Sequence, residues 1–154
     1  MKKLLLVILL ALSFNLNAQE ERQERMEFLG ISFSCNNKEF QEELVEKGFS
    51  YTGNYYYNGE FLGCIRLLDF IPSCIEDEIY KVILICTHHS LELAVEDYYK
   101  IKREITVGNL YWEVGYDKCI VYVKGGEIQL ERQDYKVVVA YIDEVSEDRL
   151  IKQK

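Results

Sequence analysis

The stretch Cys86-Thr87-His88-His89 gathers the side chains of this chain that are best suited to chemistry. On a strand, Cys86 and His88 would share one face and His89 would point to the other. Thiolates and imidazoles are typical zinc ligands, but a metal site here needs further ligands from elsewhere, for example Cys35. A Cys–His nucleophile pair would need an orienting acid and an oxyanion site, and the sequence locates neither. The alternative is a strand end with a buried cysteine and two exposed histidines.

The chain has five cysteines, and their pairing stays open: Cys35, Cys64, Cys74, Cys86 and Cys119. An oxidising compartment permits disulfides, but a domain of this size does not need them, and an odd number leaves at least one thiol unpaired. Cys64–Cys74 is one candidate bridge and Cys35–Cys86 is another. Buried thiols that behave as small apolar residues are the third alternative.

Three consecutive tyrosines, Tyr55, Tyr56 and Tyr57, are the candidate ligand-binding residues. On a strand, Tyr55 and Tyr57 face one way and Tyr56 the other. If helices cover only one side of the sheet, aromatic side chains on the open side would form a binding surface for protein, peptide or glycan. The alternative is cross-strand aromatic packing that stabilises a hairpin.

The N-terminus predicts export. Lys2 and Lys3 precede an apolar run over residues 4–12, and small and polar residues follow up to Ala18. This is the pattern of a secretory signal peptide over residues 1–18, and the run is too short to span a bilayer. We therefore expect a periplasmic or extracellular protein, with a charged flexible lead over residues 19–25 and a single domain over residues 26–154.

The charge of the chain disfavours nucleic acid as a partner. The sequence has 18 basic and 26 acidic residues. Removal of Lys2 and Lys3 with the signal peptide leaves 16 basic and 26 acidic residues, which is a net charge of −10. An acidic surface repels phosphate backbones, and the sequence has no basic cluster with interleaved aromatics. It also has no glycine-rich phosphate loop or calcium-binding loop, so it predicts no cofactor.

The segment 36–49 positions the first of two predicted helices. Asn36 and Glu39 have the spacing of a capping box, and Gly48 fits the left-handed residue that ends a helix. Phe40 and Leu44 fall on one face of this helix. A second helix begins near Ser90 and follows helical spacing to residue 105.

The remaining segments predict strands. We expect a first strand over residues 26–34, a hairpin that turns at Asn58-Gly59, a central strand over residues 78–87, and a second hairpin at Gly125-Gly126. The fold class is α+β: an antiparallel sheet of six to eight strands with both helices on one face, built from two pseudo-repeated β-α-β-β units. Residues 144–154 would form one helical turn or a loose tail.

A resemblance spans most of the chain after the signal peptide. The residues that carry this resemblance are 28–33, Phe40 and Leu44, Lys47-Gly48-Phe49, and 59–64. In this pattern the chain resembles a group of small exported α+β proteins of gut Gram-negative bacteria that carry a domain of unknown function. Ser34-Cys35 stands where that group has a glycine-rich turn. The layout is also similar, more weakly, to β-lactamase-inhibitor-like domains, which pack helices on a sheet and bind partners. Neither resemblance implies a site residue.

These observations predict an exported binding or interaction protein without catalytic activity, whose site lies on the open face of the sheet. The alternative is a metal-dependent or Cys/His-dependent enzyme centred on Cys86-Thr87-His88-His89, with Cys35 as a further ligand. A third alternative is self-association through an edge strand. The sequence does not identify the ligand or the oligomeric state.

Overall fold

The computed structural model describes residues 24–53, 56–72 and 77–151. The predicted signal peptide, Tyr55 and Cys74 lie outside these residues. Within the described part of the chain, no helix is long and apolar enough to cross a membrane.

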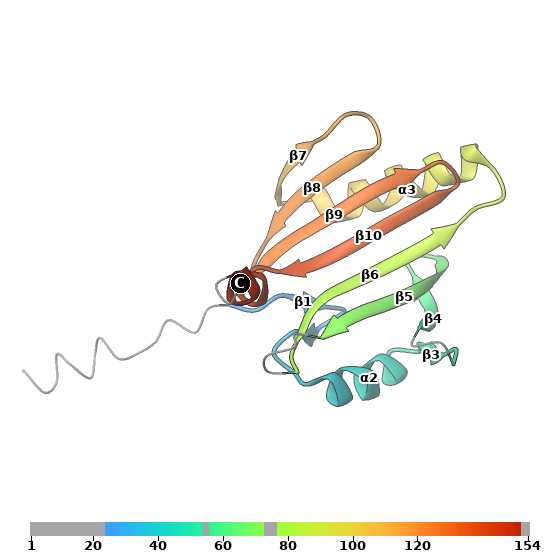
Figure 1. The fold of residues 1–154 in the computed structure, drawn as a ribbon. Coiled ribbons are helices and arrows are strands. Elements are labelled where there is room, and N and C mark those ends of the chain that lie inside the picture. Colours follow the sequence, from blue (N-terminus) through green and yellow to red (C-terminus); the bar gives the residue numbers. More distant parts are fainter. Residues whose placement is uncertain (1–23, 54–55, 73–76, 152–154) are drawn as a thin grey trace, which may run out of the picture.

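Most of the fold is one antiparallel sheet of eight strands (Figure 1). In sheet order the strands are β3 (Ser50–Tyr51), β4 (Tyr57–Phe61), β5 (Cys64–Pro72), β6 (Ile79–Thr87), β10 (Lys136–Asp143), β9 (Gly126–Gln133), β8 (Lys118–Val123) and β7 (Leu110–Glu113). The predicted α+β class, with an antiparallel sheet, is confirmed. The strand predicted to be central, β6, pairs with β10 in the middle of the sheet.

Three helices accompany the sheet in the described residues: α2 (Asn37–Glu46), α3 (Leu91–Thr106) and α4 (Glu144–Ile151). The predicted capping box of α2 is present, because Asn36 Oδ1 accepts from the Glu39 N–H at 3.0 Å and the Glu39 carboxylate accepts from the Asn36 N–H at 3.3 Å. Ser90 caps α3 by accepting from the Leu93 N–H at 3.3 Å. Gly48 has a φ of 91°, as the predicted helix stop requires. The C-terminal helix α4 is longer than the single turn that we expected.

Both α2 and α3 lie on one face of the sheet, as predicted. Arg66 and Phe70 alternate along β5 and therefore share a face. Arg66 bonds to Asp97 of α3, and the Phe70 ring lies 5.2 Å from the Phe40 ring of α2. We call this side the helix face. The opposite side of the sheet, which α2 and α3 do not cover, is called the uncovered face, although α4 contacts β6, β10 and β9, and Ala140 and Ile142 at the end of β10 on this side are buried.

The chain repeats a simple unit, although not the predicted one. A helix followed by four antiparallel strands occurs twice: α2 leads into β3–β6, and α3 leads into β7–β10. The last strands of the two units, β6 and β10, join the halves in the middle of the sheet. The β-α-β-β unit was wrong because the segment before α2 does not enter the large sheet. It forms a separate hairpin of β1 (Glu27–Phe28) and β2 (Ile31–Ser32), which turns at Leu29-Gly30.

The hairpin turn predicted at Asn58-Gly59 is also wrong. Both residues lie inside β4, and the turn occurs at Leu62-Gly63, where both φ angles are positive, 52° and 77°. Gly59 is needed for another reason, since a Cβ atom there would lie 2.3 Å from the Phe49 ring. The second predicted hairpin exists, with its turn one residue earlier, at Lys124-Gly125 between the paired residues Val123 and Gly126.

The predicted flexible lead ends sooner than expected. The Arg25 guanidinium donates to the buried carboxylate of Asp143 at 3.0 Å, to Glu78 at 2.5 Å, and to the Phe33 carbonyl at 3.2 Å. Burial opposes the charged form of Arg25, but these carboxylates outweigh it and raise the pKa of the guanidinium. Arg25 therefore belongs to the folded domain.

Candidate functional site

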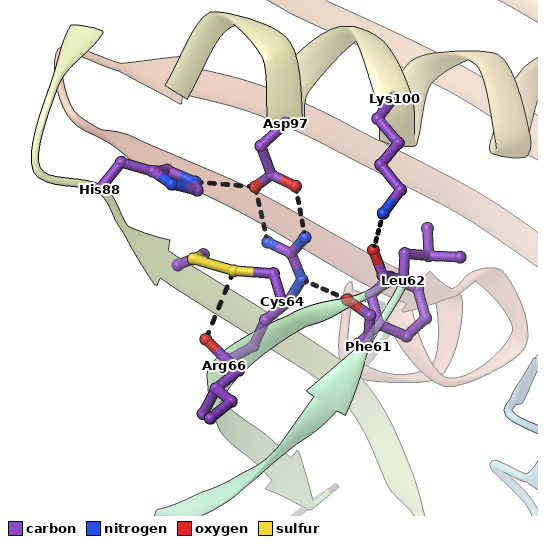
Figure 2. The surroundings of a disulfide bond; sticks show 9 residues. Phe61, Leu62, Cys64, Arg66, His88, Asp97 and Lys100 are labelled. Carbon is purple, nitrogen blue, oxygen red and sulfur yellow. Dashed lines mark hydrogen bonds and ion pairs between the residues drawn. A yellow bond between two sulfur atoms is a disulfide. The ribbon is translucent and has the colours of Figure 1, made fainter. Parts of the chain in front are cut away.

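A group of polar and sulfur-containing side chains lies between β5, β6 and α3 (Figure 2). Cys86 and Asp97 are buried, and Cys64 and His88 are half-buried. Arg66 is completely buried, and its Nη1 and Nη2 donate to the two carboxylate oxygens of Asp97 at 3.0 and 2.7 Å. Its Nε donates to the Phe61 carbonyl at 3.1 Å. His88 Nε2 lies 2.9 Å from Asp97 Oδ2. Each of the three nitrogens of the Arg66 guanidinium thus donates either to the Asp97 carboxylate or to the Phe61 carbonyl at the end of β4.

The electrostatics of Asp97 follow from this arrangement. Burial alone would raise the pKa of the carboxyl group, but the hydrogen bonds and positive charge of Arg66, with a further contribution from His88, lower it below its ordinary value. Asp97 is therefore a carboxylate at neutral pH. A buried, charge-assisted and bidentate pair of this kind fixes α3 against β5 in one position.

The structure joins Cys64 and Cys86 in a disulfide between β5 and β6, beside His88 and Asp97. Leu67 pairs with Ile85, and this register places Arg66, not Cys64, opposite Cys86. The bridge is therefore diagonal, and its Cα atoms lie 7.2 Å apart. The bridges that the sequence left open, Cys64–Cys74 and Cys35–Cys86, are therefore both wrong.

Of the predicted metal ligands, the structure brings Cys86 and His88 together but not Cys35. Asn36 pairs with Glu78, just before β6 begins, whereas Cys86 lies eight residues further along β6. At about 3.3 Å per residue, this places Cys35 roughly 25 Å from Cys86. The additional neighbours of Cys86 and His88 are Cys64 and Asp97. One ligand atom from each of these four residues lies within 4.8 Å of the others.

Sequence reasoning missed Arg66 and Asp97, although each leaves a signal. Asp97 falls between Ala94 and Ile101 on the apolar face of α3, and Arg66 alternates with Leu68 on the buried side of β5. Opposite charges in core positions of two neighbouring elements predict a buried ion pair.

Of the three predicted tyrosines, Tyr57 does not lie on the uncovered face. Tyr57 has only 5% of its surface exposed and lies on the helix face, where its hydroxyl donates to Gln41 Oε1 of α2 at 3.1 Å. Its ring packs against Tyr51 and Phe70 at 5.4 and 5.9 Å. Tyr56 is half-buried, and Tyr55 lies outside the described residues. The reason is register, because Tyr57 pairs with Leu68, which faces the helices.

Tyr57 does line a pocket of about 470 Å³ at the edge of the helix face, together with Gln41, Tyr51 and Asp69. Its role in binding a ligand stays a prediction.

The uncovered face has an aliphatic centre. Leu67, Ile85 and Val138 lie in one row across β5, β6 and β10, and Ile83 and Ala140 lie beside each other in the next row. All are half-buried except Ala140, which is buried near the end of β10 from which α4 continues.

The same face becomes polar and then aromatic toward β7. Gln129 of β9 continues the row of Ala140, and Ile120 and Trp112 complete it on β8 and β7. Trp112 is 68% exposed, and the next row brings the exposed Tyr122 beside Leu110. Exposed aromatics therefore gather at the β7 edge of the sheet.

No protein-family model, curated protein or solved structure matches this chain. The resemblance to exported domains of unknown function stays a prediction.

Proposed function

We propose that this protein is exported and binds another protein through the uncovered face of its eight-stranded sheet. The observation that carries the proposal is the aliphatic row Leu67, Ile85 and Val138, on the side of the sheet opposite α2 and α3. Antiparallel sheets with one solvated face ordinarily place polar side chains on that face. A contiguous apolar patch in the middle of such a face is typical of an interaction surface.

The chemistry of the patch favours a protein partner over a glycan. Its central side chains are aliphatic, whereas sugar rings are bound by aromatic rings and hydrogen-bonding groups. The aromatic residues of this face, Trp112 and Tyr122, lie at its β7 edge, and both residue types are enriched among the side chains that dominate binding energy between proteins.

Export is supported by the sequence of residues 1–18, which lie outside the described structure. Mass spectrometry of the protein recovered from outside the cytoplasm tests it, and the expected first residue is Gln19. Recovery of the chain in the cytoplasm with residues 2–18 intact would overturn this part of the proposal.

Photo-crosslinking tests the surface. A photoreactive amino acid at Ile85 samples the uncovered face, and the same residue at Glu42 of α2 is the matched control on the opposite side. We expect one protein to be crosslinked from position 85 and not from position 42. With that protein purified, Val138→Glu should weaken binding at least tenfold, and Glu42→Lys should leave the affinity unchanged.

Thermal unfolding of Val138→Glu establishes that the variant is folded, and Ile83→Thr provides a milder second change on the same surface. Unchanged affinity in both variants, or crosslinks from position 85 to glycan alone, would overturn the proposal.

A further inference from the structure

We propose that Cys64, Cys86, His88 and Asp97 form a zinc-binding site when the Cys64–Cys86 disulfide is reduced. This inference is independent of the proposed binding surface, because the four residues lie on the helix face and the aliphatic row lies on the other side of the sheet.

The ligand set matches zinc. Two thiolates, one imidazole and one carboxylate supply the four N, S and O donors that Zn²⁺ takes in tetrahedral sites. Calcium and magnesium prefer shells made of oxygen alone, so they do not suit this group. The four donor atoms already lie within 4.8 Å of one another. Zinc bonds of about 2.0–2.3 Å place tetrahedral ligands roughly 3.3–3.8 Å apart, so the widest separations need to shrink by only about 1 Å, and the two sulfur atoms move apart once the disulfide is broken.

The contact between His88 and Asp97 shows where the ion would sit. His88 Nε2 and Asp97 Oδ2 are 2.9 Å apart, with one proton between them in the hydrogen bond. Two ligands of a tetrahedral zinc ion, each bonded at about 2.0 Å, lie slightly farther apart than this. Zinc can therefore replace that proton after a small outward movement, with the imidazole proton carried on Nδ1.

Arg66 makes the site electrically neutral. Zinc carries two positive charges, the two thiolates and the Asp97 carboxylate carry three negative charges, and the Arg66 guanidinium adds one positive charge. The bidentate pair with Arg66 also holds the carboxylate in a fixed orientation, which is the function that outer-shell partners have at metal sites. Without this guanidinium, the zinc-bound group would carry a buried negative charge.

The redox step balances with a dithiol as reductant. The dithiol gives two electrons and two protons to the Cys64–Cys86 bond, which breaks to form two thiols, and the reductant becomes a disulfide. Zinc binding then releases both thiol protons to solvent. The disulfide and the zinc complex use the same two sulfur atoms, so they exclude each other, and the oxidation state of the pair decides whether the site binds metal.

Titration with Co²⁺ and Zn²⁺ tests the site in the full chain after signal removal. The reduced protein should bind one Co²⁺ with the visible absorption and charge-transfer bands of thiolate-bound tetrahedral cobalt, and Zn²⁺ should displace it. The oxidised protein should show neither band. Absence of these bands in the reduced protein, or equal metal binding by the oxidised protein, would overturn the proposal.

Variants assign the ligands. Cys64→Ser and His88→Gln should each weaken zinc binding at least tenfold, whereas Cys35→Ser should leave it unchanged, because Cys35 lies at the other end of β6. Unchanged zinc affinity in Cys64→Ser and His88→Gln would contradict the assignment.

A measurement on the unmodified chain tests the zinc site even if the variants fail to fold. In the reduced protein, zinc should slow the alkylation of Cys64 and Cys86, followed by peptide mass spectrometry, and should leave the alkylation of Cys35 unaffected. Equal protection of all three cysteines would overturn the proposal.

Discussion

Arg66 and Asp97 form a bidentate ion pair in which the guanidinium is completely buried and the carboxylate side chain is 8% exposed. Arg66 lies on β5 of the first helix-and-four-strand unit, and Asp97 lies on α3 of the second. Lys100, one turn after Asp97, donates to the Leu62 carbonyl at the tip of the β4–β5 hairpin at 2.5 Å. One face of α3 therefore ties the two halves of the molecule together through polar contacts.

Removing the carboxylate should destabilise the fold strongly. Asp97→Ala leaves the buried Arg66 charge without its partner, and the expected loss in free energy of unfolding is about 3–5 kcal/mol. Urea denaturation measures it. Glu42→Ala, which removes a carboxylate from the exposed pair with Lys38, is the control and should cost less than about 0.5 kcal/mol.

The double variant Arg66→Met with Asp97→Leu tests the reason for that loss. It removes both charges and retains apolar volume, so much of the stability should return. A loss below about 1 kcal/mol for Asp97→Ala alone would contradict a structural role for the pair.

Cys35 should be an unreactive thiol at neutral pH. Burial, with the nearby carboxylates of Glu43 and Glu39, raises its pKa to about 11. Its alkylation rate should therefore be low at pH 8 and rise about tenfold per pH unit toward pH 11, since the thiolate is the nucleophile. The raised pKa of Cys35 also makes the stability of the fold depend on pH. The protonated thiol contributes fully to the free energy of unfolding below the unfolded-state pKa of about 8.5, and this contribution is lost as the pH rises through about 11.

Peptide mass spectrometry locates the alkylated thiol, and the urea-unfolded chain provides the reference rate. Glu43→Gln should speed the alkylation of Cys35, because it removes a negative charge that opposes the thiolate. Glu42→Gln is the matched control. Alkylation of the native protein at the unfolded rate at pH 8 would contradict this prediction.

A methyl group at residue 59 should be costly because of the Phe49 ring. The added Cβ of Gly59→Ala would lie 2.3 Å from a ring carbon of a side chain that is only 2% exposed. The expected loss is about 1–3 kcal/mol, the usual effect of overpacking a core. In a Phe49→Ala background the same substitution should cost close to nothing, and a double-mutant cycle measures the difference. Equal costs in the two backgrounds would show that the ring is not the cause.

Local sequence signals predicted the two helices α2 and α3 and most of the strand segments, because these depend on residues that are close in the chain. Asn36 and Glu39 cap α2 through contacts three residues apart, and Ser90 caps α3 in the same way. The length and the nearly continuous apolar composition of residues 78–87 likewise indicated β6 and its central place. Hairpin registers were less predictable. Asn58-Gly59 has the composition of a turn, but packing against Phe49 uses the glycine and moves the turn to Leu62-Gly63.

The candidate site was only half predictable, because it depends on strand pairing. Cys86 and His88 are close in the sequence, so their proximity in the structure could be predicted. Cys64 joins them through the antiparallel register of β5 and β6, and Asp97 joins them through the packing of α3. Cys35 was expected as a further ligand across a strand pair, but the strands that precede it form a separate short hairpin outside the large sheet.

Trp112 reports on the state of the β7 edge. It is the single tryptophan of the chain and is 68% exposed on an edge strand, so the dilute native protein should fluoresce like indole in water. Unfolding in urea should then shift the emission little, and Trp112→Phe should change the free energy of unfolding by less than about 0.5 kcal/mol. A tryptophan placed at the buried position Phe61 in the Trp112→Phe background is the control, and its emission should shift strongly on unfolding.

The concentration dependence of the Trp112 emission separates an exposed edge from a paired one. Strand pairing between two copies through β7 would bury the indole and move its emission to shorter wavelength as the concentration rises. Glu113 lies beside Trp112 on the edge and forms a partly exposed ion pair with Lys102 of α3 at 2.6 Å. Strand pairing there would have to bury these charged groups, which opposes it. We therefore expect the emission to stay constant with concentration. Short-wavelength emission at every concentration would contradict the exposed position of Trp112.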